Sequence, residues 1–143
     1  MERDRIMDDI NASTAREIIA SAEEKANEMG VPMCIAVMDE GANLVSFHRM
    51  DEALLASIDI AQNKAYSAVS LQMDTDTIHE ISQPGESLYG LGTTNGGRIV
   101  TFGGGFQLKR NDDTVVGGIG VSGGSASEDM EVAQAGVQAF ENS

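Results

Sequence analysis

A glycine-rich stretch between Thr114 and Asp129 constrains the fold more than any other part of the chain. A run of β-branched residues leads into Gly118, Gly120 and Gly123, which have G-x-G-x-x-G spacing, and a helical pattern follows. Inside a βαβ unit, this arrangement brings the backbone close to a pyrophosphate at a helix N-terminus. Only twenty residues follow Gly123, which leaves no room for a second parallel strand. We therefore predict a final strand and a terminal helix, and not a Rossmann nucleotide site.

The start of this terminal helix carries clear N-terminal signals. Ser125 and Glu128 have the spacing of a capping box, and Glu128 and Asp129 place negative charge in the first turn, where the helix dipole favours it. This pattern predicts a mainly structural role for both carboxylates. The backbone amides of residues 123–127 are candidates for holding an anion or a partner's carboxylate.

The length of 143 residues and the hydrophobic content of 41% predict one globular domain, with residues 1–10 as a flexible N-terminal segment. The N-terminus is charged and lacks an apolar signal core, and no stretch is long enough to span a bilayer, so we expect a cytoplasmic protein. A single cysteine, Cys34, excludes an internal disulfide and a multi-cysteine metal site. We therefore expect no metal site.

The net charge of −14 arises from 23 acidic and nine basic residues, and the acidic residues are spread over every segment. A dispersed acidic surface is typical of proteins in high salt, where screening removes the self-repulsion. We interpret the composition as halophilic. The same charge makes nucleic acids and anionic membranes poor partners.

Hydrophobic periodicity predicts an α+β domain with a five-stranded antiparallel sheet and packed helices. The first helix follows a capping box at Thr14 and Glu17 and stops at Gly30. The other predicted helices are residues 54–68, 76–82, 86–91 and 125–140, and the predicted strands are residues 32–39, 44–50, 98–102, 106–110 and 114–121.

Several ordered motifs carry a family resemblance over about residues 11–141. They are Val37-Met-Asp-Glu-Gly41, Arg49-Met-Asp51, Ala61-Gln-Asn-Lys-Ala-Tyr-Ser-Ala68, Gly104-Gly-Phe-Gln-Leu108 and Gly117-Gly-Ile-Gly-Val-Ser-Gly-Gly124 with Glu128-Asp129. With these motifs the chain resembles the GlcG/HbpS family of haem-binding-protein-like domains, which also occurs as the C-terminal domain of a corrinoid adenosyltransferase. The resemblance implies a profilin-like fold, a homo-oligomer and haem as a candidate cofactor.

The chain departs from the family pattern at two positions. Gln107 stands where a proline is usual, and Glu52 stands where a glycine commonly follows Arg-Met-Asp. For haem, the weak axial candidates are His48 in the second strand and His79 in a short polar helix. No ligand to haem iron is carried over from the family motifs.

A candidate ligand site combines Arg49, Asp51 and Lys64 with the turn Gly103, Gly104 and Gly105. Arginine suits a carboxylate, propionate or phosphate, and glycines allow close approach. The alternatives are structural: an interface salt bridge for Arg49, and for Lys64 an ion pair with Asp39, Asp51 or a neighbouring subunit.

The sequence thus predicts a small homo-oligomeric protein that binds a small-molecule ligand, with haem or another tetrapyrrole as the leading candidate. One alternative is an enzyme that uses Lys64 and Arg49 in acid–base chemistry on a small organic acid. The other is a stability or scaffold factor for a partner enzyme.

Overall fold

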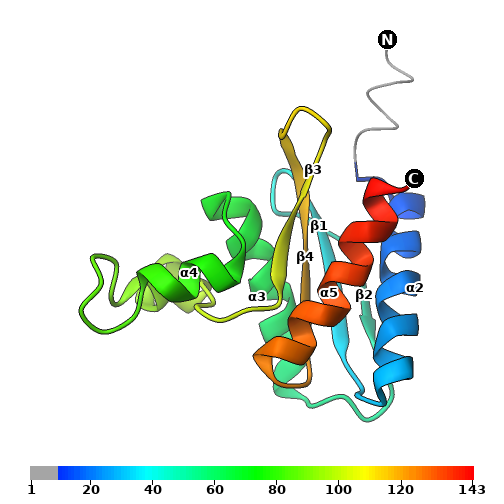
Figure 1. The fold of residues 1–143 in the computed structure, drawn as a ribbon, viewed down its shortest axis with the longest axis horizontal. Helices are drawn as coiled ribbons and strands as arrows, with labels where there is room; N and C mark the ends of the chain where they lie inside the picture. Colours follow the sequence, from blue (N-terminus) through cyan, green and yellow to red (C-terminus); the bar gives the residue numbers. More distant parts are fainter. Residues whose placement is uncertain (1–9) are drawn as a thin grey trace.

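The computed structural model describes residues 10–143, and its centre is one antiparallel sheet with strand order β2-β1-β4-β3 (Figure 1). The strands are β1 (Cys34–Asp39), β2 (Leu44–Arg49), β3 (Gly105–Lys109) and β4 (Val115–Ser122). The helices are α2 (Ala12–Met29), α3 (Ala56–Leu71), α4 (Thr75–Ile81) and α5 (Ala126–Glu141), with short 3-10 turns η1 (Leu91–Thr93) and η2 (Asn95–Gly97).

The helices cover the two faces of the sheet in separate layers. α2 and α5 pack together on one face, and α3 lies on the other (Figure 1). Side chains of β1 alternate between the two layers, as expected for a strand. Ile35 and Val37 join the core under α2 and α5, whereas Cys34 and Ala36 pack toward α3. Burial raises the pKa of the Cys34 thiol, although nearby Arg49 opposes the shift.

The ends of α2 follow local capping chemistry. Gly30 ends the helix in the left-handed conformation, with φ of 73°, as the sequence predicts. The capping box predicted at Thr14 and Glu17 is wrong, because the cap is Asn11, whose side chain accepts a hydrogen bond from the Thr14 amide at 2.8 Å. Ile10 is 7% exposed and belongs to the core, while the rest of the predicted flexible segment lies outside the described residues.

The sheet has four strands and not five, because residues 98–102 form irregular structure. Their backbone is satisfied by α3 instead of by a neighbouring strand. The hydroxyl of Ser67 accepts a hydrogen bond from the Val100 amide at 2.8 Å, and its own proton has the Asn63 carbonyl at 2.7 Å and the Arg98 carbonyl at 3.2 Å as acceptors. Ile99 is 3% exposed, so this apolar side chain is buried although the segment does not pair with a strand.

The helix predicted at residues 86–91 is also wrong. The segment forms turns and leads into η1 and η2. Gly85, just before the segment, adopts a φ of 91°, and Gly90, near its end, adopts a φ of 93°. Repeated left-handed residues prevent a continuous right-handed helix from forming here.

The glycines that resembled a nucleotide motif instead let α3 lie directly on β4. A Cβ atom at Gly120 would collide with the Ala61 carbonyl oxygen, and one at Gly118 would lie 3.0 Å from the Ala65 carbonyl oxygen. The missing side chains therefore set the distance between helix and sheet. This close contact explains Gly118 and Gly120 without a ligand.

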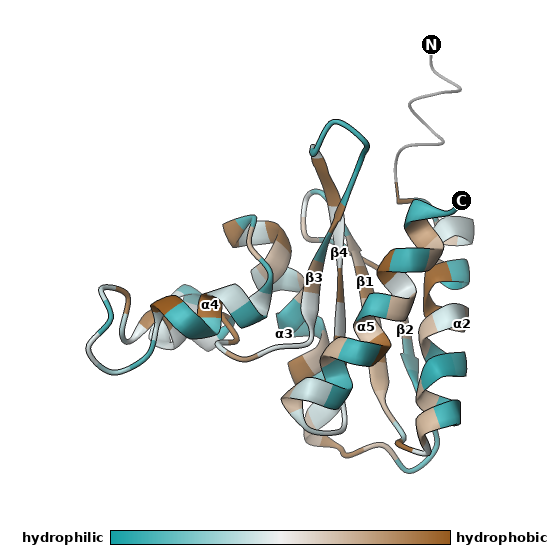
Figure 2. Cartoon of the chain, in the orientation of Figure 1, coloured by the Kyte–Doolittle hydropathy of each residue, from teal (hydrophilic) through white to brown (hydrophobic). Residues whose placement is uncertain are grey.

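Residues 72–104, which connect α3 to β3, form a projection that we call the arm. It includes α4, η1 and η2 and extends away from the sheet (Figure 1). Both hydrophilic (teal) and hydrophobic (brown) segments occur on the arm (Figure 2). Three large apolar side chains on the arm are substantially exposed: Leu88 at 45%, Tyr89 at 69% and Phe102 at 43%. Among residues 10–143 there is no helix with the length and apolar character that a membrane span requires.

Candidate functional site

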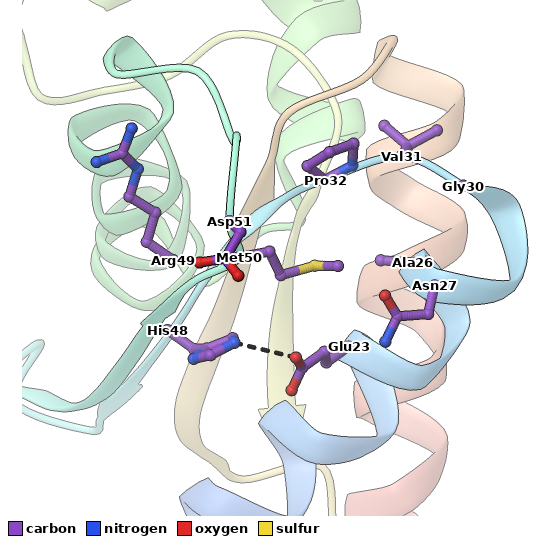
Figure 3. A pocket seen from close by; sticks show the side chains of 10 residues that line it. All are labelled: Glu23, Ala26, Asn27, Gly30, Val31, Pro32, His48, Arg49, Met50 and Asp51. Atoms are coloured by element: carbon purple, nitrogen blue, oxygen red, sulfur yellow. Dashed lines mark hydrogen bonds and ion pairs between the residues drawn. The ribbon is translucent and has the colours of Figure 1, made fainter.

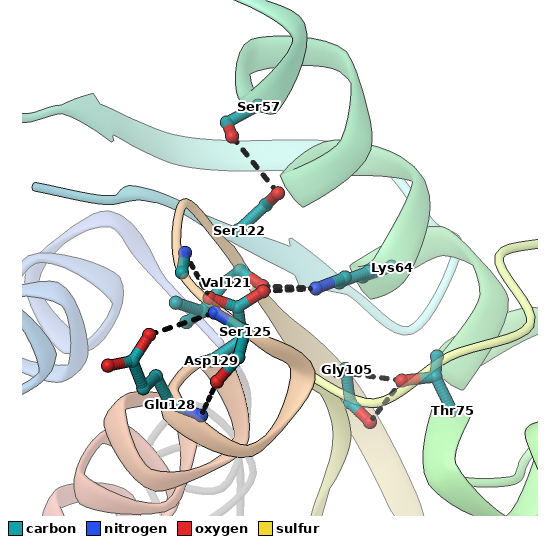
Figure 4. A network of polar contacts seen from close by, with 10 residues as sticks. Ser57, Lys64, Thr75, Gly105, Val121, Ser122, Ser125, Glu128 and Asp129 are labelled. Atoms are coloured by element: carbon teal, nitrogen blue, oxygen red, sulfur yellow. Dashed lines mark hydrogen bonds and ion pairs between the residues drawn. The ribbon is translucent and has the colours of Figure 1, made fainter. Parts of the chain in front are cut away.

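Lys64, one of the predicted site residues, is fully buried between α3 and the start of α5. Its Nζ donates to Asp129 Oδ2 at 2.9 Å and to the Val121 carbonyl at 2.8 Å (Figure 4). The exposed fractions of the two side chains are 0% and 4%. The ion-pair partner of Lys64 is therefore Asp129, and not Asp39 or Asp51.

Burial acts on both members of this pair. It lowers the pKa of Lys64, an effect that the Asp129 carboxylate opposes. It raises the pKa of Asp129, and here the opposing group is the Lys64 ammonium. Either charge alone would carry a large desolvation cost in this buried position, so each of the two residues requires the other.

The triple-glycine turn makes room for this buried pair. A Cβ atom at Gly104 would lie 2.6 Å from Lys64 Nζ, and one at Gly103 would lie 2.5 Å from the Met130 sulfur. A Cβ atom at Gly105 would lie 2.8 Å from a Thr75 methyl carbon. The structure thus brings Lys64 and the turn together, as the sequence predicts, but protein atoms fill the space around them.

Two of the backbone amides before α5, those of Gly124 and Ser125, are occupied by the chain's own carboxylates. The Gly124 amide donates to Asp129 Oδ1 at 2.8 Å, and the Ser125 amide donates to Glu128 Oε1 at 2.9 Å (Figure 4). The Glu128 amide in turn donates to the Ser125 hydroxyl, which completes the predicted capping box. These groups therefore have internal partners.

Arg49 and Asp51 lie elsewhere, at a pocket of about 400 Å³ between the C-terminal part of α2 and the end of β2 (Figure 3). Its polar lining includes Glu23, Asn27 and His48. Lys64 does not line this pocket. The structure therefore divides the predicted site into two places, with Arg49 and Asp51 at one and Lys64 with the glycines at the other.

Within this pocket, the polar groups are already partly engaged. His48 Nε2 lies 3.1 Å from Glu23 Oε2, which ties β2 to α2 (Figure 3). The Arg49 guanidinium points away from Glu23 and donates from Nη2 to the Ala53 carbonyl at 3.0 Å (Figure 3). His48 and Arg49 emerge on opposite faces of β2, consistent with their neighbouring positions on a strand.

His79 lies on the arm, and its ring is oriented by a backbone group. Its Nδ1 is 3.0 Å from the Thr101 carbonyl oxygen and 3.1 Å from the side-chain nitrogen of Gln83. The side-chain nitrogen of Gln83 donates to the His79 carbonyl at 2.9 Å and packs beside the same ring. The residue is exposed. Both printed contacts of the ring therefore use Nδ1.

Arg98, which sequence reasoning missed, is held against α3. Its guanidinium carbon is 3.6 Å from the centroid of the Tyr66 ring, and its Nε donates to Asn63 Oδ1 at 3.1 Å. Tyr66 also accepts a hydrogen bond from Asn95 at 3.0 Å. The spacing of Asn63 and Tyr66 on a helix, together with an arginine after two glycines, was the signal available for this arrangement.

The two departures from the family pattern have structural counterparts. Glu52 adopts a left-handed φ of 70°, a conformation that glycine accepts at lower cost. The Gln107 amide donates to Asp74 Oδ1 at 2.9 Å, and its side chain donates to the same oxygen at 3.2 Å. Proline has no amide hydrogen and cannot make the first of these bonds. Across residues 10–143, no three His, Cys, Asp or Glu side chains form a group suited to a metal ion.

Comparison with known proteins places this geometry in a family. Residues 10–138 match the HbpS-like family, described as haem degrading protein HbpS-like. The crystal structure of Klebsiella pneumoniae protein ORFY is 43% identical, with a TM-score of 0.89 over 92% of this chain and 90% of that chain. The crystal structure of a PduOC:heme complex is 35% identical, with a TM-score of 0.88 over 92% of this chain and 94% of that chain.

A longer relative contains the same unit as one part. The corrinoid adenosyltransferase PduO of Salmonella typhimurium is 38% identical over 124 residues, which are 87% of this chain but 37% of PduO. Since the match to the HbpS-like family covers most of the chain and agrees with the fold, the chain belongs to the HbpS-like family.

Proposed function

We propose that this protein binds haem or a related tetrapyrrole. The observation that carries the proposal is its likeness, in both sequence and fold, to a relative solved in complex with heme. Family membership points to the same ligand class. The sequence motifs alone implied haem as the ligand. The structure adds the positions of the side chains that would bind it.

The residues of the chain fit such a ligand in their chemistry. Both histidines, His48 and His79, lie outside the buried core and can offer an imidazole nitrogen to iron. Arg49 and Arg98 are cations that suit propionate groups through paired hydrogen bonds. When bound, the iron of haem supplies the coordination and redox chemistry, while the protein's part is to hold and orient the ligand.

Titration of the purified protein with hemin tests the proposal. We expect the Soret band to shift and sharpen as free hemin binds to the protein and its iron gains a protein ligand. Protoporphyrin IX without iron is the matched probe, because it reports ring binding without iron coordination. A Soret band that remains that of free hemin at every protein concentration would contradict the proposal.

The geometry gives no support to acid–base catalysis by Lys64 and Arg49. Lys64 is 0% exposed and is hydrogen-bonded to Asp129, and it does not line the pocket that contains Arg49. A proton shuttle must reach its substrate, directly or through one water. A scaffold role for a partner enzyme stays a prediction.

We also propose that the protein is a homo-oligomer. Leu54 and Leu55, just before α3, are 64% and 75% exposed, and a second copy of the chain would remove these apolar side chains from water. Light scattering should report a multiple of the 15.1 kDa chain mass. A monomer at all concentrations would contradict this.

A further inference from the structure

We propose that Asn95 is a site of spontaneous deamidation, at which the backbone nitrogen of Gly96 displaces the side-chain nitrogen of Asn95. Asparagine is among the chemically labile residues of proteins. Of the seven asparagines in the sequence, Asn95 is the one that a glycine follows. Because glycine has no Cβ atom, little hinders the approach of its nitrogen to the preceding side chain. The dipeptide therefore has the residue types that favour this reaction.

The structure leaves this dipeptide open to solvent on the arm. Asn95 is exposed, and a Cβ atom built at Gly96 or Gly97 would meet no other atom within 4 Å. Within residues 10–143, the Gly96 amide donates to no carbonyl oxygen, so no backbone hydrogen bond holds the attacking nitrogen. Water has access to the reacting groups, and neighbouring side chains do not block their movement.

The backbone of the turn must open before the reaction can occur. Asn95 has a left-handed φ of 53°, and Gly96 and Gly97 follow with φ values of 66° and 82°. This conformation costs asparagine more than it costs glycine. Two backbone bonds hold the turn, from the Gly97 amide to the Thr94 carbonyl at 2.9 Å and from the Arg98 amide to the Asn95 carbonyl at 3.2 Å. Opening one short turn is a local event that does not require unfolding of the sheet.

A hydrogen bond to α3 restrains the reacting side chain. Asn95 Nδ2 donates to the Tyr66 hydroxyl at 3.0 Å. The Arg98 guanidinium lies against the same ring, with its central carbon 3.6 Å from the ring centroid. Since the Asn95 amide must turn toward the Gly96 nitrogen, it has to leave Tyr66 first. The Tyr66 hydroxyl therefore slows the reaction in the folded protein.

The reaction needs no cofactor. A bond forms between the Gly96 nitrogen and Asn95 Cγ, the bond between Cγ and Nδ2 breaks, and ammonia leaves with the proton that the Gly96 nitrogen loses. Water then opens the five-membered ring at one of its two carbonyl carbons. The products are aspartate and isoaspartate. In isoaspartate the main chain runs through the former side chain and is one methylene longer.

Deamidation would change the contact between the arm and α3. A carboxylate has no proton to donate, so the Tyr66 hydroxyl would have to donate to it. The new negative charge would lie beside the ring that carries the Arg98 guanidinium, and it would offset that positive charge. Isoaspartate would also shift the backbone between Thr94 and Arg98.

The test follows the purified wild type by peptide mass spectrometry during incubation at mildly alkaline pH. Residue 95 should gain the mass of an amide-to-acid conversion about tenfold faster than Asn111, an exposed asparagine that Asp112 follows. Methylation by an isoaspartate methyltransferase should label the isoaspartate product. A synthetic peptide of residues 91–98 provides the rate of the unrestrained reaction, and it should convert faster than the folded protein.

Two variants separate the dipeptide from its surroundings. Gly96→Ala should slow the conversion about tenfold, because its Cβ atom hinders the attacking nitrogen. Tyr66→Phe keeps a ring beside Arg98 but removes the hydroxyl, and it should speed the conversion about threefold. Tyr89→Phe is the matched control, since Tyr89 is 69% exposed on the arm and should not affect the rate.

The outcomes that overturn the proposal are distinct. If residue 95 keeps its amide while the synthetic peptide converts, or converts no faster than Asn111, Asn95 is not the site. If Asn95 converts but Tyr66→Phe reacts at the wild-type rate, the restraint by the Tyr66 hydroxyl is overturned and the site itself stands.

Discussion

Polar side chains have different surroundings in the body of the molecule, formed by the sheet and its packed helices, and on the projecting arm. In the body, Lys64 and Asp129 are buried charges that bond to each other, and Gly104 at the end of the arm leaves space for them. On the arm, His79 and Arg98 are each fixed through one part of the side chain and leave other nitrogen atoms without a partner in the described residues. The charged pair of the body is used within the fold, whereas His79 and Arg98 on the arm are exposed.

This difference shows that an unusual residue can have a structural explanation. A lysine in a charge-poor helix attracts attention, yet its contacts explain its presence as part of the core. An exposed histidine attracts little attention, yet its Nδ1 contacts both the Thr101 carbonyl and Gln83. The predictions below separate these two kinds of residue by their effects on stability.

The largest loss of stability is expected from Asp129→Asn. The substitution leaves the Lys64 ammonium buried without its carboxylate, and removal of one partner from a buried pair costs about 3–5 kcal/mol. Urea denaturation should measure the loss. Glu131→Gln is the control, since Glu131 pairs with Lys25 at 3.4 Å with side chains that are 55% and 35% exposed. That surface pair should contribute no more than about 1 kcal/mol.

The loss caused by Asp129→Asn should depend on pH with a definite sign. Burial lowers the pKa of Lys64 from 10.5, and loss of the carboxylate lowers it further. The unfolded state then binds more protons than the folded state, so stability rises with pH between the folded pKa and 10.5. The difference from wild type should shrink from neutral pH toward pH 10. A difference independent of pH would argue against a buried ammonium.

A second, smaller loss is expected from Gly120→Ala in β4. Its Cβ atom would collide with the Ala61 carbonyl oxygen in α3, so the helix must move from the sheet, at a cost of about 1–3 kcal/mol. Gly92→Ala on the arm is the matched control, because its Cβ atom would meet only ordinary contacts at 3.4 and 3.5 Å. Equal thermal melts for the two variants would contradict the close contact of α3 and β4.

Added salt should stabilise the protein by roughly 4 °C in Tm, which corresponds to about 1 kcal/mol. Screening reduces repulsion among the acidic residues that give the net charge of −14. Thermal melts from low to molar sodium chloride test this prediction of a halophilic surface. If added salt does not raise the Tm, the halophilic interpretation is contradicted.

The smallest effect on stability is expected from His79→Ala and Arg98→Gln on the arm. Both side chains are exposed, and surface substitutions usually change stability by about 0.5 kcal/mol or less. The same urea denaturation applies. A loss of stability comparable to that of Asp129→Asn would show that these two residues are structural. It would contradict the difference proposed between the arm and the body.

The sequence by itself determined the α+β class, the order of most elements and the family. Periodicity identified α2, α3 and α5 because each buries a face, and Gly30 and Ser125 marked helix ends because capping is a local interaction. The strands that became β1, β2, β3 and β4 were visible for the same reason, since their apolar residues and turns are local signals. The ordered motifs indicated the family, which hydrophobic periodicity and capping signals alone do not.

The tertiary structure decided which residues meet. It paired Lys64 with Asp129, 65 positions later in the chain, and separated Arg49 from Lys64. It also replaced the fifth strand with a segment bound by Ser67. Sequence spacing specifies a face of a helix or strand, but partners across layers depend on how those layers pack. The Thr101 carbonyl that orients His79 belongs to the backbone, and a backbone contact leaves no signature in residue type.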